Sequence, residues 1–510
     1  MAAVPPFPIR PDRPSHPAGR RSARPARPDR EAIARTAVWG ALAFGIAFDA
    51  TLHGPPGIGW PLAAIVAFAG VEAFGHVRRA AAPFFIAGIA ISAFAALRAS
   101  PILLVIDAAA AISLFCLGAA FAREGLPAVS TVRAYVARTL SIIAVVPEGL
   151  AWTAGVVRPS DPNGRLRNLP RTAVIVVPVT AVFAVLLGSA DPVFARLLTA
   201  PIRVGPGSWP VHAIGVAAGA AAFACLLVRV RRPVAVEAEE RPLPTPEGLR
   251  GGEWIAMLVA VDAVFAAFVV VQFAYFFGGR TRVLQQQGLT FAEYARSGFW
   301  QLLAAAALTG AVIGFAWMAG GGSAIGRHRA IFAWLAGGLV AMTAVVLVSA
   351  FRRLSLYEDA FGFTWSRVLG HIAVLVVAAL LICGLVAVCV RRASWLPAAA
   401  VVVAVVAVIG LNALDPDAFI ASRNIDRYRA TGTLDTSTLG TLSADAAPVL
   451  AAALPLLDPC DRWLVAGLLR DVRDGLASAR GWASWSLSRE RAADAVAALP
   501  QGPPLHAPCV

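Results

Sequence analysis

Residues 355–371 read SLYEDAFGFTWSRVLGH, a polar stretch that follows one long apolar run, 329–350, and ends in the first turn of another, 368–390. Each run is close to the roughly 20 residues that a helix needs to cross a bilayer. The polar residues Tyr357, Glu358 and Asp359 lie between the two runs. The pattern predicts two membrane-spanning helices that are joined by a polar connection at one membrane surface.

Similar apolar runs recur along the whole chain. Hydrophobic residues make up 58% of the 510 positions, charged residues only 15%, and the mean hydropathy is +0.71. Soluble domains usually hold about 45–50% apolar and about 25% charged residues. The sequence therefore predicts an all-α protein, a polytopic transmembrane helical bundle of about eleven spans. We expect these spans at 35–53, 57–76, 80–97, 101–121, 172–189, 210–229, 253–276, 300–319, 329–350, 368–390 and 396–412.

The segment 139–157 is apolar, but Pro147, Glu148 and Gly149 interrupt its centre. All 44 basic residues are Arg, and cytoplasmic connections are enriched in Arg. If 139–157 does not span, an N-terminus inside puts 26 Arg on the inner side and 9 on the outer side, excluding the last 98 residues. If it spans, the split is 21 against 14. The larger asymmetry favours an interfacial 139–157, a cytoplasmic N-terminus and an extracytoplasmic C-terminus.

This topology divides the chain into five parts. They are a disordered, basic, proline-rich cytoplasmic tail (1–34), a front transmembrane half of six spans plus the interfacial segment (35–229), a cytoplasmic linker (230–252), a back half of five spans (253–412) and an extracytoplasmic helical domain (413–510). Outside the cytoplasm, Cys460 and Cys509 could oxidise to a disulfide, and two unpaired thiols are the alternative.

Three polar stretches, 288–300, 355–371 and 414–428, face the extracytoplasmic side in this topology. We hypothesise that they form one surface that binds a ligand or partner. Its candidate residues are Tyr294, Arg296, Tyr357, Glu358, Asp359, Arg423, Asn424 and Arg427. The alternative is structural: aromatic residues in the membrane interface, solvated charges, and pairing of Asp426 with arginines of its own helix.

Asp262 and Asp107 are among the acidic residues that fall inside predicted spans, as are Asp49 and Glu72. Ionisable groups are rare within membranes and are functional candidates by default. Asp262 and Asp107 lead to a second hypothesis, a secondary transporter that uses one of these two carboxylates as an ion or proton site. A structural hydrogen bond to a neighbouring polar group is the alternative for each.

Sequence signatures of enzymes are largely missing. We find no nucleophile elbow, zinc-protease motif, phosphate-binding loop or dinucleotide fingerprint, and the seven His have no metal spacing. We therefore expect a non-enzymatic protein without cofactor or metal, and the net charge of +14 is not a sign of nucleic-acid binding. A third hypothesis is a membrane-embedded transferase acting on a lipid-linked substrate, which needs a deep polar cavity near Glu358 and Asp359.

Several motifs together resemble a known family. QFAYFFGG (272–279), GLTFAEYARSGFW (288–300), LYEDAFGFTWSRV (356–368), DPDAFIASRNIDRY (415–428) and GWASWSLSRERA (481–492) are similar to the bacterial multi-pass membrane family known as domain of unknown function 4173. The resemblance covers roughly 250–492. It implies an integral protein of the bacterial inner membrane with an unresolved function, and it supplies no catalytic residues. For the partners we expect the lipid bilayer and another membrane or envelope protein, in a signalling or envelope role.

Overall fold

The computed structural model describes residues 30–52, 54–75, 77–123, 209–231, 253–277, 299–319, 328–390, 392–478 and 481–497, with 127–130, 134–135, 138 and 499. Within these residues the chain is helical and contains no strand. The predicted all-α class is therefore confirmed. The predicted segments 139–157 and 172–189 lie outside the described residues, as do most of the polar stretch 288–300 and the tail 1–29.

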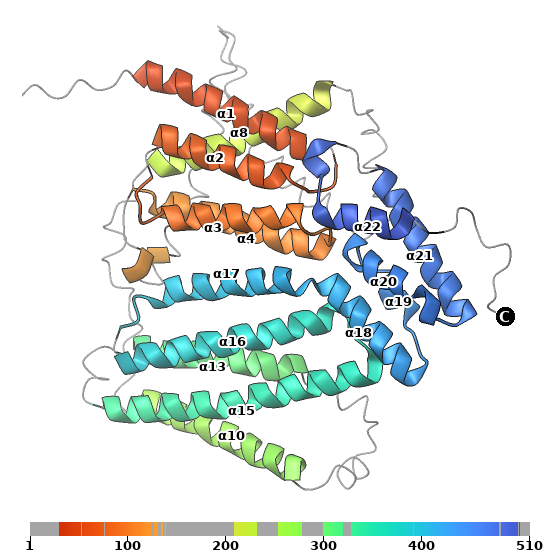
Figure 1. Cartoon of the computed structure of the whole chain (residues 1–510). Coiled ribbons are helices and arrows are strands. Elements are labelled where there is room, and N and C mark those ends of the chain that lie inside the picture. Colours follow the sequence, from red (N-terminus) through yellow and green to blue (C-terminus); the bar gives the residue numbers. More distant parts are fainter. Residues whose placement is uncertain are drawn as a thin grey trace, which may run out of the picture.

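The long helices form the bundle shown in Figure 1. In the front half they are α1 (Arg30–Leu52), α2 (Gly59–Gly75), α3 (Ala82–Ser92) with the short η1 (Ala93–Ala96), α4 (Pro101–Phe121), η2 (Pro127–Val129) and α8 (Trp209–Arg231). In the back half they are α10 (Glu253–Phe277), α13 (Phe299–Ala319), α15 (Arg329–Phe361), α16 (Trp365–Val390) and α17 (Leu396–Leu414).

The remaining elements form a smaller C-terminal domain at one end of the bundle (Figure 1). They are α18 (Pro416–Thr431), α19 (Thr436–Leu439), η5 (Ala444–Ala446), α20 (Ala447–Ala453), η6 (Leu454–Leu456), α21 (Pro459–Ser478), η7 (Trp482–Ser484) and α22 (Leu487–Ala497). Side chains such as Ile425, Leu450, Val465 and Leu469 form its own hydrophobic core. The domain therefore does not depend on the bundle for its interior.

Local sequence explains several helix starts. Proline stands in the first turn of α4, α17 and α18, where its missing N–H group is not needed and its fixed φ angle suits a helix. Ser443 caps η5, and Asp458 accepts the N–H of Asp461 at the start of α21. The observed boundaries agree with the predicted ones within a few residues, with one exception. The helix predicted to end at 350 continues as α15 to Phe361.

We call the end of the bundle that carries the C-terminal domain the domain face. The connections 52–59, 97–101, 361–365 and 414–416 all lie there. On α8, His212 contacts Asp49 near the end of α1, with 2.7 Å between Nδ1 and Oδ2, and Arg231 donates to the carbonyl of Phe74 near the end of α2. α8 therefore starts at the domain face and ends at the opposite face, in the same direction as α4.

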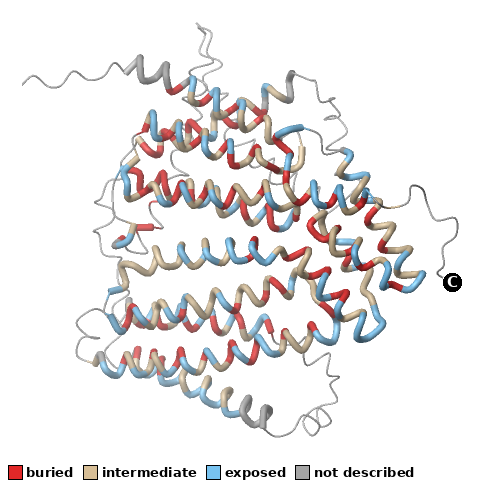
Figure 2. The backbone as a smooth tube through the Cα atoms, in the orientation of Figure 1, coloured by how far each residue is buried: buried red, intermediate tan, exposed pale blue. Residues whose placement is uncertain are grey.

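Five described helices are long and apolar enough to cross a membrane: α4, α13, α15, α16 and α17. Several large apolar side chains of the long helices are exposed, including Trp334, which is 82% exposed. Figure 2 shows exposed positions, in pale blue, along the long helices. Soluble monomers rarely expose large continuous apolar surfaces, whereas a lipid environment favours them. The chain is thus an integral membrane protein.

Glycine allows α1 and α8 to approach each other closely. A Cβ atom at Gly45 would lie 2.4 Å from the carbonyl oxygen of Val216, and one at Gly219 would lie 2.9 Å from the Cα of Gly45. Membrane helices are tightly packed by such small residues, because lipid provides no hydrophobic force to bring two apolar helices together. The α1–α8 pair is therefore held by close backbone contact.

Polar contacts join the front half to α17. The Asn412 side chain donates to Asp107 Oδ1 of α4 over 2.7 Å, and both residues are completely buried. Arg98, between η1 and α4, donates to the carbonyl of Asn412 at 3.0 and 2.7 Å and forms an ion pair with Asp415. We call these four residues the Arg98 cluster. It connects the two halves of the bundle beside the C-terminal domain.

We predict that Asn412→Ala destabilises the protein by about 1–3 kcal/mol, because the buried Asp107 carboxylate loses its hydrogen-bond donor. The measurement is thermal unfolding of the purified protein in detergent. Val406→Ala on the exposed side of α17 is the matched control, and its effect should stay within about 0.5 kcal/mol. Equal effects of the two variants would contradict the role assigned to Asn412.

Candidate functional site at the bundle–domain junction

The polar stretch 355–371 is not an exposed loop, because most of it continues α15. Glu358 is only 3% exposed, and its Oε2 lies 2.9 Å from Nε2 of His371 on α16. Asp359, the next residue, is exposed. The Glu358 carboxylate therefore lies inside the bundle, where it joins α15 to α16, and its predicted role in binding a ligand or partner stays a prediction.

The turn between these helices is ordered by the candidate residue Asn424 of α18. Its Oδ1 accepts the N–H of Phe363 and its Nδ2 donates to the carbonyl of Phe363, both at 2.9 Å. Gly362 has a φ angle of +80°, and a Cβ atom there would lie 2.3 Å from Asn424 Oδ1. Only glycine fits this conformation and this approach. The structure thus brings the stretches 355–371 and 414–428 together.

Other predicted residues surround the same turn. Arg427 donates to the carbonyl of Ala360 over 2.8 Å. The guanidinium of Arg367 lies 4.2 Å from the ring centroid of Tyr357 and donates to the carbonyl of Gly362. Arg427 and Tyr357 therefore stabilise the α15–α16 turn through contacts within the protein.

Helical spacing suggested pairing of Asp426 with Arg423 or Arg427, but the contacts that the structure shows for Asp426 and Arg423 are different ones. Asp426 forms an exposed ion pair with Arg429 at 3.2 Å, whereas Arg423 lies over the ring of Phe419 at 5.3 Å from its centroid. The other two candidates, Tyr294 and Arg296, lie outside the described residues.

Sequence reasoning missed the carboxylates that dock the C-terminal domain. Asp445 Oδ2 accepts the backbone N–H groups of Ala99 and Ser100, both at 2.9 Å, at the start of α4. A carboxylate at this position also interacts favourably with the helix dipole. Asp417 accepts the indole N–H of Trp365 and the N–H of Ser443. Asp445 also accepts from the nearby hydroxyl of Ser443, but no local motif reveals the contacts with Ala99, Ser100 and Trp365, which are distant in sequence.

Burial changes the acidity of this junction. It raises the pKa of the Asp415 carboxyl to about 6; the charge of Asp445 adds to the rise, and Arg98 reduces it. Burial also raises the pKa of Asp417, and the hydrogen bonds from Ser443 and Trp365 oppose that rise. The junction therefore contains groups that titrate above the usual range of carboxylates.

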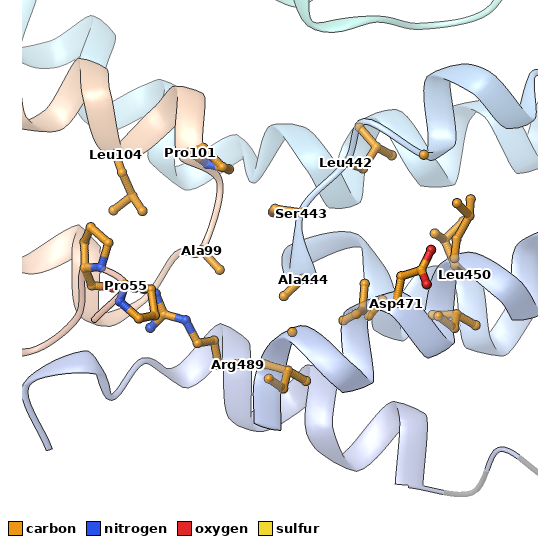
Figure 3. A pocket seen from close by; sticks show the side chains of 18 of the residues that line it. Pro55, Ala99, Pro101, Leu104, Leu442, Ser443, Ala444, Leu450, Asp471 and Arg489 are labelled. Atoms are coloured by element: carbon orange, nitrogen blue, oxygen red, sulfur yellow. Dashed lines mark hydrogen bonds between the residues drawn. The ribbon is translucent and has the colours of Figure 1, made fainter. Parts of the chain in front are cut away.

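A cleft of 880 Å³ opens between the bundle and the C-terminal domain. Figure 3 shows Pro55, Pro101 and Leu104 on the bundle side and Leu442, Leu450 and Asp471 on the domain side. The lining is mainly apolar, and the charged side chains that contribute to it are Asp471 and Arg489. The domain walls come from the 439–450 region, α21 and the start of α22.

Arg489 fixes one side of the cleft. Its guanidinium donates to the carbonyls of Pro56 and Ser484 and, at 3.0 Å, to the hydroxyl of Ser486. The N–H of Ile58 donates to the carbonyl of Trp485 over 2.9 Å. The α1–α2 connection is thus bound through its backbone to the Arg489 side chain of α22 and to the carbonyl of Trp485 just before α22.

The intramembrane acids have different surroundings. Asp107 is engaged by Asn412, which favours the structural alternative for this residue. Asp262 is partly buried on α10, and its Oδ1 has no hydrogen-bond partner within the described residues. Neither residue lines the 880 Å³ cleft or either of two smaller cavities of 510 and 230 Å³.

The same three cavities bear on the transferase hypothesis. None of them is lined by Glu358 or Asp359, so the polar cavity that this hypothesis requires is not found among them.

Cys460 is disulfide-bonded, and its predicted partner Cys509 lies outside the described residues.

We predict that Asn424→Ala lowers the free energy of unfolding by about 1–3 kcal/mol, because it leaves the N–H and carbonyl of Phe363 without their partner. The control is Asp359→Ala, at an exposed position near the end of α15. It should change the free energy of unfolding by less than about 0.5 kcal/mol. Chemical denaturation of both variants measures the difference. A larger effect at Asp359 would show that the exposed carboxylate, rather than the turn, matters for stability.

A pH dependence follows from Asp415. Its usual pKa is 3.8, so between that value and about 6 the folded protein holds a proton that the unfolded chain releases. The free energy of unfolding should therefore increase as the pH falls from about 7 to about 5. Asp415→Asn should reduce this slope in melting curves, and Asp359→Asn should leave it unchanged. An unchanged slope in Asp415→Asn would refute the assignment.

Comparison with known proteins identifies a family to which this chain is similar. The family model described as Domain of unknown function (DUF4153) matches residues 85–453, well over half of the chain. The match differs from the predicted family number 4173, and it extends further into the front half than the resemblance indicated. No curated protein and no solved structure matches the chain. The matched residues include the whole Arg98 cluster, and the chain belongs to the DUF4153 family of domains of unknown function.

Proposed function

We propose that this chain is a non-enzymatic integral membrane protein that binds an amphipathic ligand in the cleft between its bundle and its C-terminal domain. The domain face is placed on the extracytoplasmic side of a bacterial cytoplasmic membrane, with the N-terminus in the cytoplasm. The predicted function of ligand binding at the outer face is retained, but its site moves from the polar stretches to the cleft.

The composition of the cleft carries this proposal. Ligand sites are commonly concave, mostly apolar and supplied with a few polar groups that orient the ligand. Here α4 supplies apolar side chains such as Leu104 and Val105, and α21 supplies Leu468 and Val472. Asp471 and Arg489 add charge at the walls. An amphipathic molecule matches this combination, because its apolar part can cover the walls while its polar part meets the charges.

The walls are held in position by contacts that do not involve a ligand. Asp445 binds the start of α4, and Arg489 binds the carbonyl of Pro56. These bonds connect the domain to the bundle on two sides of the cleft. A preformed site avoids the cost of ordering its walls on binding, which increases affinity.

Two observations support the orientation. The Arg distribution favours a cytoplasmic side opposite the domain face. A disulfide at Cys460 is compatible with an oxidising compartment for the domain. A topology reporter fused after Val510 tests this part of the proposal independently of binding.

The cleft can be filled by a single substitution on α21. Gly475 lines the cleft, and a Cβ atom there would have no heavy atom within 4 Å. Gly467 on the same helix has equally open space but does not line the cleft. Gly475→Trp is therefore the test, and Gly467→Trp is its matched control.

The probe is a palmitoyl lysophosphatidylcholine with a photoreactive diazirine near its headgroup, added to membranes that contain the protein. Peptide mass spectrometry should find the label on α21, which lies beyond the apolar spans. Gly475→Trp should reduce that label about tenfold, as a loss of about 1.4 kcal/mol in binding implies, and Gly467→Trp should not. An unlabelled α21, or equal labelling of both variants, would refute the proposal.

A further inference from the structure

A second cavity lies next to the cleft, within the bundle. It measures 510 Å³ and is bounded by α1, α2, α4 and α8, with Phe44, Phe115 and Phe223 among its lining residues. Trp60 and Ala108 line both this cavity and the outer cleft. The two spaces therefore adjoin at these two residues.

One face of α4 forms a continuous wall of both spaces. The residues of α4 that line them follow helical spacings of three and four, which places them in one stripe along the helix. They are Pro101, Leu104, Val105, Ala108, Ala111, Ile112, Phe115 and Ala119, with Cys116 beside them. At 1.5 Å per residue the stripe is about 27 Å long, close to the roughly 30 Å of a bilayer's hydrocarbon core.

The stripe is open to lipid. Val105 is 69% exposed and Ile112 is 64% exposed, although both belong to a helix that is apolar enough to span. The acidic residue of the same helix, Asp107, points elsewhere and is fully buried against Asn412. The surrounding membrane therefore has direct access to this face of α4.

The cavity also lacks polar groups that would attract a polar ligand. The hydroxyl of Thr51 donates to the carbonyl of Phe48, and that of Ser92 donates to the carbonyl of Ile89. Arg229 donates to the carbonyl of Ala120. These polar side chains are bonded to backbone, and the rest of the wall is mainly apolar, with the thiols of Cys116 and Cys225 among it. Apolar cavities accept apolar molecules.

We infer that the two spaces form one site for a lipid of the surrounding bilayer. Its acyl chain runs along α4 from the cleft, past Trp60 and Ala108, into the cavity, while its headgroup stays in the cleft beside Asp471. This inference rests on the proposed function, because it identifies the amphipathic ligand as a long-chain bilayer lipid.

The point shared by the two spaces can be blocked. Ala108→Trp places an indole between the cleft and the cavity, and Ile112→Trp fills the cavity from an exposed position if the first variant fails to fold. Ala109→Trp is the control, because Ala109 is exposed and lines neither space.

The experiment compares two palmitoyl lysophosphatidylcholine probes in membranes, one with the diazirine near the headgroup and one with it at the end of the chain. In the unsubstituted protein and in Ala109→Trp, the headgroup probe should label α21 and the chain-end probe should label the Phe223 region of α8. Ala108→Trp should lower the α8 label about tenfold, since excluding two methylene groups from an apolar site costs about that much affinity.

The outcomes separate this inference from the proposed function. If the headgroup probe labels α21 but the chain-end label on α8 is the same in Ala108→Trp, Ile112→Trp and the control, the cleft binds an amphiphile and the chain path is wrong. If neither probe labels α21, both the inference and the proposed function are overturned. If Ala108→Trp and Ile112→Trp both lose the label on α8 while Ala109→Trp keeps it, the path along α4 is supported.

Discussion

The Arg98 cluster is the contact on which the arrangement of this protein depends. Arg98 supplies a positive charge to the last turn of α17, where it satisfies the carbonyl of Asn412 and pairs with Asp415. The side chain of Asn412 in turn holds Asp107 of α4. A buried carboxylate and a helix end without partners are both costly in a membrane, so these four residues must remain together. Their association places the front half against α17.

The C-terminal domain takes its position from the same region. Asp415 directly precedes α18. Asp445 of the domain accepts the N–H groups of Ala99 and Ser100, the two residues that follow Arg98 and lead into α4. On the other side, Arg489 binds the α1–α2 connection. The outer cleft exists because the domain is held at these separate points and leaves the face of α4 between them uncovered. In our proposal the ligand site is therefore the space that the docking contacts leave between the bundle and the C-terminal domain.

The sequence allowed the helices and their order to be predicted well, because each apolar run carries its own signal of length and composition. It was less informative about α15, whose polar last three turns were assigned to a connection. Charged residues after an apolar run do not show whether the helix ends there or continues beyond the membrane. Glu358 illustrates the consequence: its carboxylate is buried against His371, a contact that depends on how α15 and α16 pack.

The sequence by itself determined that this is an all-helical membrane protein, since about twenty apolar residues in a row have few other stable structures in a bilayer. It predicted Asn424 and Arg427 as binding residues, which stays a prediction, and the contacts that the structure shows for them are with the α15–α16 turn. Only the tertiary structure decided which polar groups meet and where space remains. Arg98 and Asn412 are more than three hundred residues apart, and the stripe on α4 becomes a wall of a cleft only when the C-terminal domain docks beside it. Such contacts have no local pattern, because they arise from the packing of elements that are distant in the chain.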